Sequence, residues 1–330
     1  MADLRAPEEP ADRPAARPQA RSRGQLILVG GLAVAVGIVV LVLLLNTAIY
    51  TQNLTTRDAD TGDGPPLALR ESVTDGVADL LGSENRRVHT DRTRLGAHAH
   101  GAIGNVSNLL GRQYALATAS ARITNVSLHN GTYLRQTDSG RALTSDGGMI
   151  NWTLAKNADG VRKFNVNTTD VLADLTLADA DLQSDAFRVV VEGASDTWIM
   201  YVYRNSTTRA MAVKNGSASN PNWGVCSSLI VSDPSINLTA GTVDGSDCPA
   251  LAFAKGVSKP YDIKYANGDN VTGTYNLTVN TTKTVGFNPP GSAEQPRRWP
   301  VIYDADLTVV YEAPDLRYAT RVHVEPEGGP

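Results

Sequence analysis

The sequence predicts a mainly β protein: an N-terminal transmembrane helix and a short helical stalk, followed by an antiparallel β-sandwich-like extracellular domain. Three observations predict it: a long uncharged apolar run, apolar residues at helical spacing before residue 120, and short β-rich runs separated by turn dipeptides after it. Hydrophobic residues make up 42% and charged residues 19%, as in globular proteins. A net charge of -4 excludes a strongly basic surface, so we expect no nucleic-acid partner.

The apolar run covers Leu26 to Leu45, and no charged residue occurs from Gly24 to Thr56. A helix of about 20 such residues spans roughly 30 Å, the thickness of the hydrocarbon core of a bilayer. We therefore predict a transmembrane helix over residues 25–50, with the lipid bilayer as its partner.

Arginines predict the orientation of this span. The first basic residue after it is Arg57, whereas five arginines precede it: Arg5, Arg13, Arg17, Arg21 and Arg23. Because basic residues stay on the cytoplasmic side, we expect a single-pass protein with a cytoplasmic N-terminus and an extracellular C-terminal domain. Residues 1–24, rich in proline and charge, are predicted to be a disordered cytoplasmic leader.

The run has three alternative fates: a removed signal, a permanent anchor, or the stem of a filament subunit. A removable signal has an apolar core of about 7–15 residues and a small-x-small cleavage site. Here the run is longer and Asn46-Thr47-Ala48 matches such a site poorly. These features favour a retained helix.

The junction Arg23-Gly24-Gln25 before the uncharged helix resembles the class III signal of archaeal pilins and archaellins. The resemblance implies that prepilin peptidase cuts after Gly24, that the mature chain begins at Gln25, and that other pilin-like subunits bind through the apolar helix. Bacterial type IV pilins carry a glutamate near the start of the mature helix, and this chain has none there.

The last 30 residues extend the resemblance. Residues 301–325 alternate polar and apolar side chains on either side of Ala313-Pro314-Asp315, which predicts a hairpin with Ala305, Leu307, Val309 and Tyr311 on one face. Together with the N-terminal junction, this hairpin resembles uncharacterised pilin-like secreted surface proteins of halophilic archaea. That resemblance implies an exported surface protein and no particular chemistry.

Asn-x-Ser/Thr sequons are abundant beyond the span, which agrees with an extracellular, glycosylated surface. The alternative is an Asn- and Thr-rich β surface without glycans. The twelve sequons begin at Asn53, Asn105, Asn125, Asn130, Asn151, Asn167, Asn205, Asn215, Asn237, Asn270, Asn276 and Asn280.

Cys226 and Cys248 are the chain's two cysteines. In an extracellular domain such a pair most simply forms a disulfide, worth about 3 kcal/mol for a loop of this length. Two free thiols or a metal-binding pair are the alternatives.

Residues 51–119 are predicted to be a linker and helical stalk with one or two helices, and residues 120–330 an extracellular β-rich domain. Apolar residues recur at helical spacing from Leu69 to Leu81 and from Ile103 to Leu110. The expected strands are 123–128, 149–154, 187–192, 198–203, 275–279, 307–311 and 318–324. The expected turns are Asn130-Gly131, Asp146-Gly147, Asp159-Gly160, Asn215-Gly216 and Asn267-Gly268.

Motifs of common enzymes, among them G-x-S-x-G, the P-loop and H-E-x-x-H, do not occur. His98 and His100 would point to opposite sides of a helix, so we expect surface residues and no metal site. The four tryptophans, with Tyr201 and Tyr203, fit a sandwich core better than a sugar-binding face. We therefore expect a non-enzymatic protein without cofactor or catalytic residues: a pilin-like subunit or cell-envelope component. The alternative is a permanently anchored ligand-binding or adhesion module.

Overall fold

The computed structural model describes residues 64–172, 174–175, 179–205, 208–215, 222–225 and 234–326. The chain divides into two compact units, Met1–Pro65 and Pro66–Pro330. The predicted leader, the predicted span at 25–50 and the processing residues Arg23, Gly24 and Gln25 lie outside the described residues. Among the residues that are described, no helix is long and apolar enough to cross a membrane.

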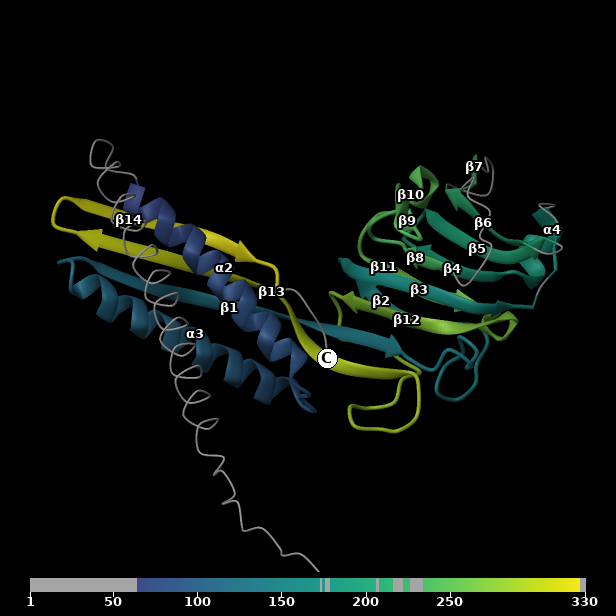
Figure 1. Ribbon diagram of the computed structural model, residues 1–330, viewed down its shortest axis with the longest axis horizontal. Helices are drawn as coiled ribbons and strands as arrows, with labels where there is room; N and C mark the ends of the chain where they lie inside the picture. Colours follow the sequence, from purple (N-terminus) through teal and green to yellow (C-terminus); the bar gives the residue numbers. More distant parts are fainter. Residues whose placement is uncertain are drawn as a thin grey trace, which may run out of the picture. The chain divides into compact units, whose positions relative to one another are not determined.

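Within residues 64–119, two helices precede the first strand, as the apolar spacing predicts (Figure 1). Helix α2 covers Gly64–Arg86 and begins with two prolines, which suit a first turn because its N–H groups have no partner in the helix. Helix α3 covers Arg92–Ala115. Its N-cap is Asp91, whose side chain accepts a hydrogen bond of 2.9 Å from the backbone N–H of Thr93.

The strands form two antiparallel sheets. The eight-stranded sheet has the order β10-β9-β8-β3-β12-β1-β13-β14, and the six-stranded sheet the order β2-β11-β4-β5-β6-β7. The bounds in the first sheet are β1 Ser120–Gln136, β3 Val161–Val171, β8 Ser235–Asn237, β9 Thr242–Val243, β10 Ser246–Asp247, β12 Val271–Val279, β13 Arg297–Ala313 and β14 Leu316–Val324.

The bounds in the second sheet are β2 Trp152–Ala158, β4 Phe187–Glu192, β5 Thr197–Asn205, β6 Thr208–Asn215, β7 Asn222–Val225 and β11 Tyr261–Ala266. The short helix α4 covers Asp179–Asp185, and two 3₁₀ turns cover Pro249–Leu251 and Gly268–Asn270. All seven expected strands coincide with or overlap observed ones, and the predicted mainly β, sandwich-like fold is confirmed.

The largest core lies between the two sheets. Alternate residues of β3 and β12, such as Phe164 and Leu277, meet alternate residues of β4 and β5, such as Val189 and Met200. Trp152 and Trp198 belong to this core, as expected. Tyr201 and Tyr203 face the opposite side of β5 and form a small separate cluster with Leu182. They are therefore core residues that line no surface.

A second core joins the helices to the sheet. Leu81 of α2 and Leu95 of α3 are fully buried against β1, β13 and β14. The face predicted for the C-terminal hairpin, Ala305, Leu307, Val309 and Tyr311, lies in this same core, and the hairpin turns at Pro314 and Asp315 as expected. Strand β1 has 17 residues and contributes to both cores, with Leu134 in the first and Ala121 and Ile123 in the second. The helices thus belong to one folded unit with the strands.

One predicted turn is wrong. Asn130-Gly131 lies inside β1, where the pairing with β13 shifts register between His129 and Asn130. Glycine is needed there for close packing, because a Cβ at Gly131 would lie 2.7 Å from the carbonyl oxygen of Val279 in β12. The turns at Asp146-Gly147 and Asn267-Gly268 are confirmed, and Asn267 has a left-handed φ of 53°.

Candidate functional site

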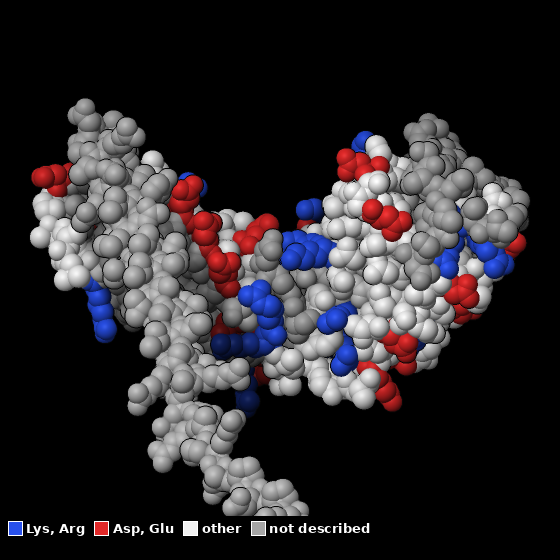
Figure 2. Space-filling model, in the orientation of Figure 1, with Lys and Arg blue, Asp and Glu red and all other residues white. Residues whose placement is uncertain are grey.

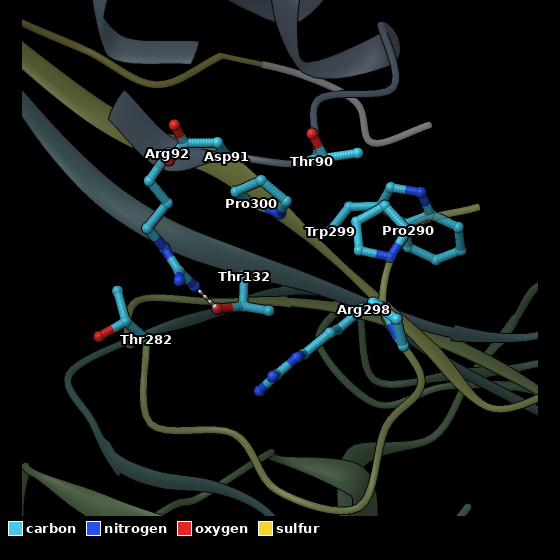
Figure 3. Close-up of a pocket in the computed structure, with 10 residues that line it drawn as sticks. Thr90, Asp91, Arg92, Thr132, Thr282, Pro290, Arg298, Trp299 and Pro300 are labelled. Atoms are coloured by element: carbon cyan, nitrogen blue, oxygen red, sulfur yellow. Dashed lines mark hydrogen bonds between the residues drawn. The ribbon is translucent and has the colours of Figure 1, made fainter. Parts of the chain in front are cut away.

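The first turn of α3 and the strands β1 and β13 enclose a cavity of about 450 Å³ (Figure 3). Thr90, Asp91 and Arg92 come from the start of α3 and Thr132 from β1. Arg298, Trp299 and Pro300 come from β13, and the segment that joins β12 to β13 adds three more residues: Thr282, Pro289 and Pro290. The pairing of Thr132 with Pro300 brings these segments together.

Two arginine side chains extend into the cavity around the hydroxyl of Thr132 (Figure 3). Arg92 donates from Nη2 to Thr132 Oγ1 at 3.0 Å, and that buried hydroxyl donates to the carbonyl of Thr281 at 2.7 Å. Arg298 donates from Nη1 to the carbonyl oxygen of Thr284 at 2.8 Å. Neither guanidinium forms an ion pair with a carboxylate of the described residues.

The two charges therefore repel one another. Burial, and secondly the positive charge of Arg298, lowers the pKa of Arg92 from its usual value. A basic residue in the first turn of a helix also opposes the helix dipole, and this turn contains no acidic residue. The single carboxylate that lines the cavity, Asp91, is occupied as the N-cap of α3. The described residues that line the cavity therefore carry two positive charges and one negative charge. On the face of the molecule that Figure 2 shows, basic and acidic side chains are interspersed.

Another described cavity has a volume of about 410 Å³. It is lined by Arg162, Lys259, Tyr261, Tyr303, Glu325 and others. Arg162 lies 3.9 Å from Glu325 and stacks over the ring of Tyr303 at 4.1 Å, so its charge already has partners within the protein. With Lys259 and Glu325, its described lining has the same net charge as that of the first cavity, but it contains one arginine and not two.

Comparison with models of protein families, with curated proteins and with solved structures found no match to this chain.

Ten of the predicted glycosylation residues have described side chains, and all ten are exposed or partly exposed. The exposed ones are Asn105, Asn125, Asn130, Asn151 and Asn205; the partly exposed ones are Asn167, Asn237, Asn270, Asn276 and Asn280. Asn53 lies outside the described residues, and the side chain of Asn215, the last residue of β6, is not described.

Two of these asparagines occupy special positions. Asn125 has a left-handed φ of 50° at a bulge of β1, a conformation that asparagine tolerates well, and its side chain is exposed. Asn276 of β12 lies directly opposite Asn165 of β3, which donates to its amide oxygen at 3.1 Å.

Of the predicted cysteine pair, Cys248 is 4% exposed in the sandwich core, and Cys226 lies outside the described residues. The segments beside them approach closely. A Cβ added at Gly224 in β7 would lie 2.7 Å from the Cβ of Ala250, which belongs to the turn that follows Cys248.

The remaining expectations concern His98, His100 and Trp299. Both histidines are exposed on α3, and the ring of His98 lies 5.6 Å from that of His89. Among the described residues no cluster of three metal-ligating side chains occurs.

Trp299, expected in the sandwich core, instead packs with Tyr133 and Val301 in a small cluster and lines the arginine cavity. Sequence reasoning missed Arg92 and Arg298, because no local motif marks two arginines that meet only through tertiary packing.

Proposed function

We propose that this protein is an exported, glycosylated and membrane-anchored surface protein that serves as a pilin-like subunit or cell-envelope component. The observation that carries this proposal is the placement of the sequons: every sequon asparagine with a described side chain is exposed or partly exposed.

The anchoring part of the proposal rests on the sequence: the uncharged run Leu26 to Leu45 with arginines on its N-terminal side. Cleavage after Gly24 would remove the charged leader and keep the apolar helix, which can then leave the bilayer and pack against the same helix of neighbouring subunits. Prepilin peptidase and further pilin-like subunits are the partners that this route requires.

A disulfide between Cys226 and Cys248 completes the proposal. The close approach of Gly224 to Ala250 supports it, because these residues lie two positions before Cys226 and two after Cys248. The bond would close a loop of about 22 residues at the edge of the sandwich.

N-terminal sequencing of the protein isolated from the cell surface tests the assembly route. We expect a mature chain that begins at Gln25, and we expect Gly24→Leu to leave the leader attached and to prevent assembly. Gly30→Leu, a glycine replacement inside the apolar run, is the matched control for processing. A chain that still begins at Met1, with assembly unchanged by Gly24→Leu, would remove the pilin-like part of the proposal.

Glycopeptide mass spectrometry tests the glycosylation. We expect glycans on exposed sequons such as Asn105 and Asn130, and none on Asn108, which is equally exposed on α3 but lacks the sequon. Unmodified peptides at every exposed sequon would contradict the proposal.

The cavity between Arg92 and Arg298 favours a second candidate, a permanently anchored ligand-binding module. This candidate shares the topology but does not require cleavage after Gly24. It predicts that the full-length protein stays monomeric in detergent and keeps its leader. Stable assembly of the protein through its apolar helix would speak against it.

A further inference from the structure

The cavity beside α3 has more positive charge than its own residues neutralise. Arg92 and Arg298 both line it, while its single carboxylate, Asp91, accepts the N–H of Thr93. Two guanidinium groups held near one another in a partly buried site raise the free energy of the empty site. An anion placed between them would offset that cost, and its binding would draw on both charges at once.

One hydrogen-bond donor of a residue that lines the cavity is also left without a partner. Nε of Arg92 is buried and has no hydrogen-bond partner among the described residues. A buried N–H without a partner lowers the stability of the fold, so a native protein normally satisfies it. Thr90 and Thr282 line the same space, and a threonine hydroxyl can donate to an oxygen atom.

The size and walls of the cavity indicate that the ligand is larger than a bare ion. Its volume of about 450 Å³ falls within the range of about 300–1,000 Å³ that is usual for small-molecule pockets. The walls include Pro289, Pro290 and Pro300 and also Trp299, a residue that is 6% exposed and whose ring packs against Tyr133 and Arg297. Proline and tryptophan offer rigid apolar surfaces against which the carbon skeleton of a ligand can pack.

We propose that this cavity binds a small organic carboxylate, whose carboxylate group is held between Arg92 and Arg298 and whose carbon skeleton packs against the proline and tryptophan wall. Arginine suits this role because its planar fork of N–H groups matches the two oxygens of a carboxylate. The inference deepens the second candidate function by naming its ligand class. It does not depend on processing at Gly24, so the carboxylate site and the pilin-like assembly route can fail separately.

Calorimetric titration of the full-length protein in detergent tests the proposal, with glucuronate as the probe and glucose as its neutral counterpart. We expect one saturable site for glucuronate and none for glucose. Inorganic sulfate should compete with glucuronate but bind more weakly, because it cannot use the apolar wall. The affinity for glucuronate should fall when NaCl rises from 50 to 500 mM, a result that needs no variant.

Variants assign the binding to this cavity. We expect Arg92→Gln and Arg298→Gln each to weaken glucuronate binding at least tenfold, and Arg298→Lys to weaken it less because the charge remains. Arg94→Gln, which removes an exposed arginine two positions along the same helix, should bind like the unmodified protein. Thermal unfolding of each variant shows whether it folds. If a glutamine variant does not fold, the intermediate affinity expected of Arg298→Lys still tests the role of the cavity.

Several outcomes would overturn the proposal. Absence of saturable binding, equal binding of glucose and glucuronate, or sulfate binding as tightly as glucuronate would each refute an organic carboxylate as the ligand. Full binding by folded Arg92→Gln and Arg298→Gln would show that the site lies elsewhere.

Discussion

The side-chain amide of Asn85 forms two hydrogen bonds with the backbone of Ile302: Nδ2 donates to the carbonyl oxygen at 2.9 Å, and Oδ1 accepts from the N–H at 2.8 Å. Strand β14 pairs with β13 only from Ala305 onward. Among the described residues, no strand on that side therefore hydrogen-bonds to the backbone N–H and carbonyl of Ile302. The amide at the end of α2 takes the place of a neighbouring strand. This contact connects the helices to β13 beside the arginine cavity.

Asn85→Ala should lower the free energy of unfolding by about 2–4 kcal/mol, because it leaves two buried backbone groups without partners. Denaturant unfolding measures the change. Asn108→Ala, an exposed asparagine on α3, should change stability by less than about 0.5 kcal/mol. Equal stability of the two variants would show that water replaces the amide at Ile302 without cost.

Leu95→Ala should cost about 2–5 kcal/mol, since Leu95 is fully buried where α3 meets the sheet. Because the helices and strands share this core, a single cooperative unfolding transition should shift, as followed by far-UV and near-UV circular dichroism. Leu116→Ala, at a position that is 91% exposed, is the control. Separate transitions for helices and strands would contradict the shared core.

The same glycine-to-alanine change should have opposite effects at two positions. At Gly131 the new methyl group would lie 2.7 Å from the carbonyl oxygen of Val279, and we expect a loss of about 1–3 kcal/mol. At Gly104 in α3 nothing lies within 4 Å, and alanine should stabilise by about 0.5–1 kcal/mol. Thermal and denaturant unfolding of both variants measure the signs. A stabilising Gly131→Ala would refute the close packing of β1 against β12.

Stability should fall between about pH 10 and pH 12. Burial, and to a lesser extent Tyr303 and Asp159, raises the pKa of Tyr261 to about 12, and burial likewise raises that of Tyr303 to about 12. Below pH 10 these phenols are protonated in both folded and unfolded chains. Above pH 10 the unfolded chain releases the protons and the folded chain retains them, so unfolding becomes more favourable as pH rises.

Unfolding at pH 9 and pH 11 measures this loss. Tyr261→Phe should reduce the difference in stability between the two pH values, whereas Tyr318→Phe, at a partly exposed position of β14, should leave it unchanged. The same loss in both variants would assign the alkaline effect to other groups.

Reduction should destabilise the protein by about 3 kcal/mol if Cys226 and Cys248 are joined, because the unfolded chain regains the freedom of the loop. Urea unfolding with and without a phosphine reductant measures the difference. The double variant Cys226→Ser with Cys248→Ser should be insensitive to the reductant. Identical unfolding of the unmodified protein in both conditions would exclude the disulfide.

Local patterns in the sequence determined most of the elements. Apolar residues at helical spacing predicted α2 and α3, and short β-rich runs predicted the strands. Alternating polar and apolar residues predicted the β13–β14 hairpin and its buried face, which runs from Ala305 to Tyr311. These patterns are readable because each helix or strand must present its apolar side chains at the period of its own backbone. Asn130-Gly131 failed as a turn because the pairing of β1 with β13 and β12 overrode the local preference.

Tertiary structure alone decided which distant residues meet. The sequence determined that arginines occur at positions 92 and 298; their shared cavity depends on the docking of α3 and on the register of Thr132 with Pro300. Likewise, Asn85 accepts the backbone N–H of Ile302 in β13 only because α2 ends beside that residue. Register and helix docking are set by the packing of whole faces, so no short stretch of sequence carries them, and the candidate site appears only once the chain is folded.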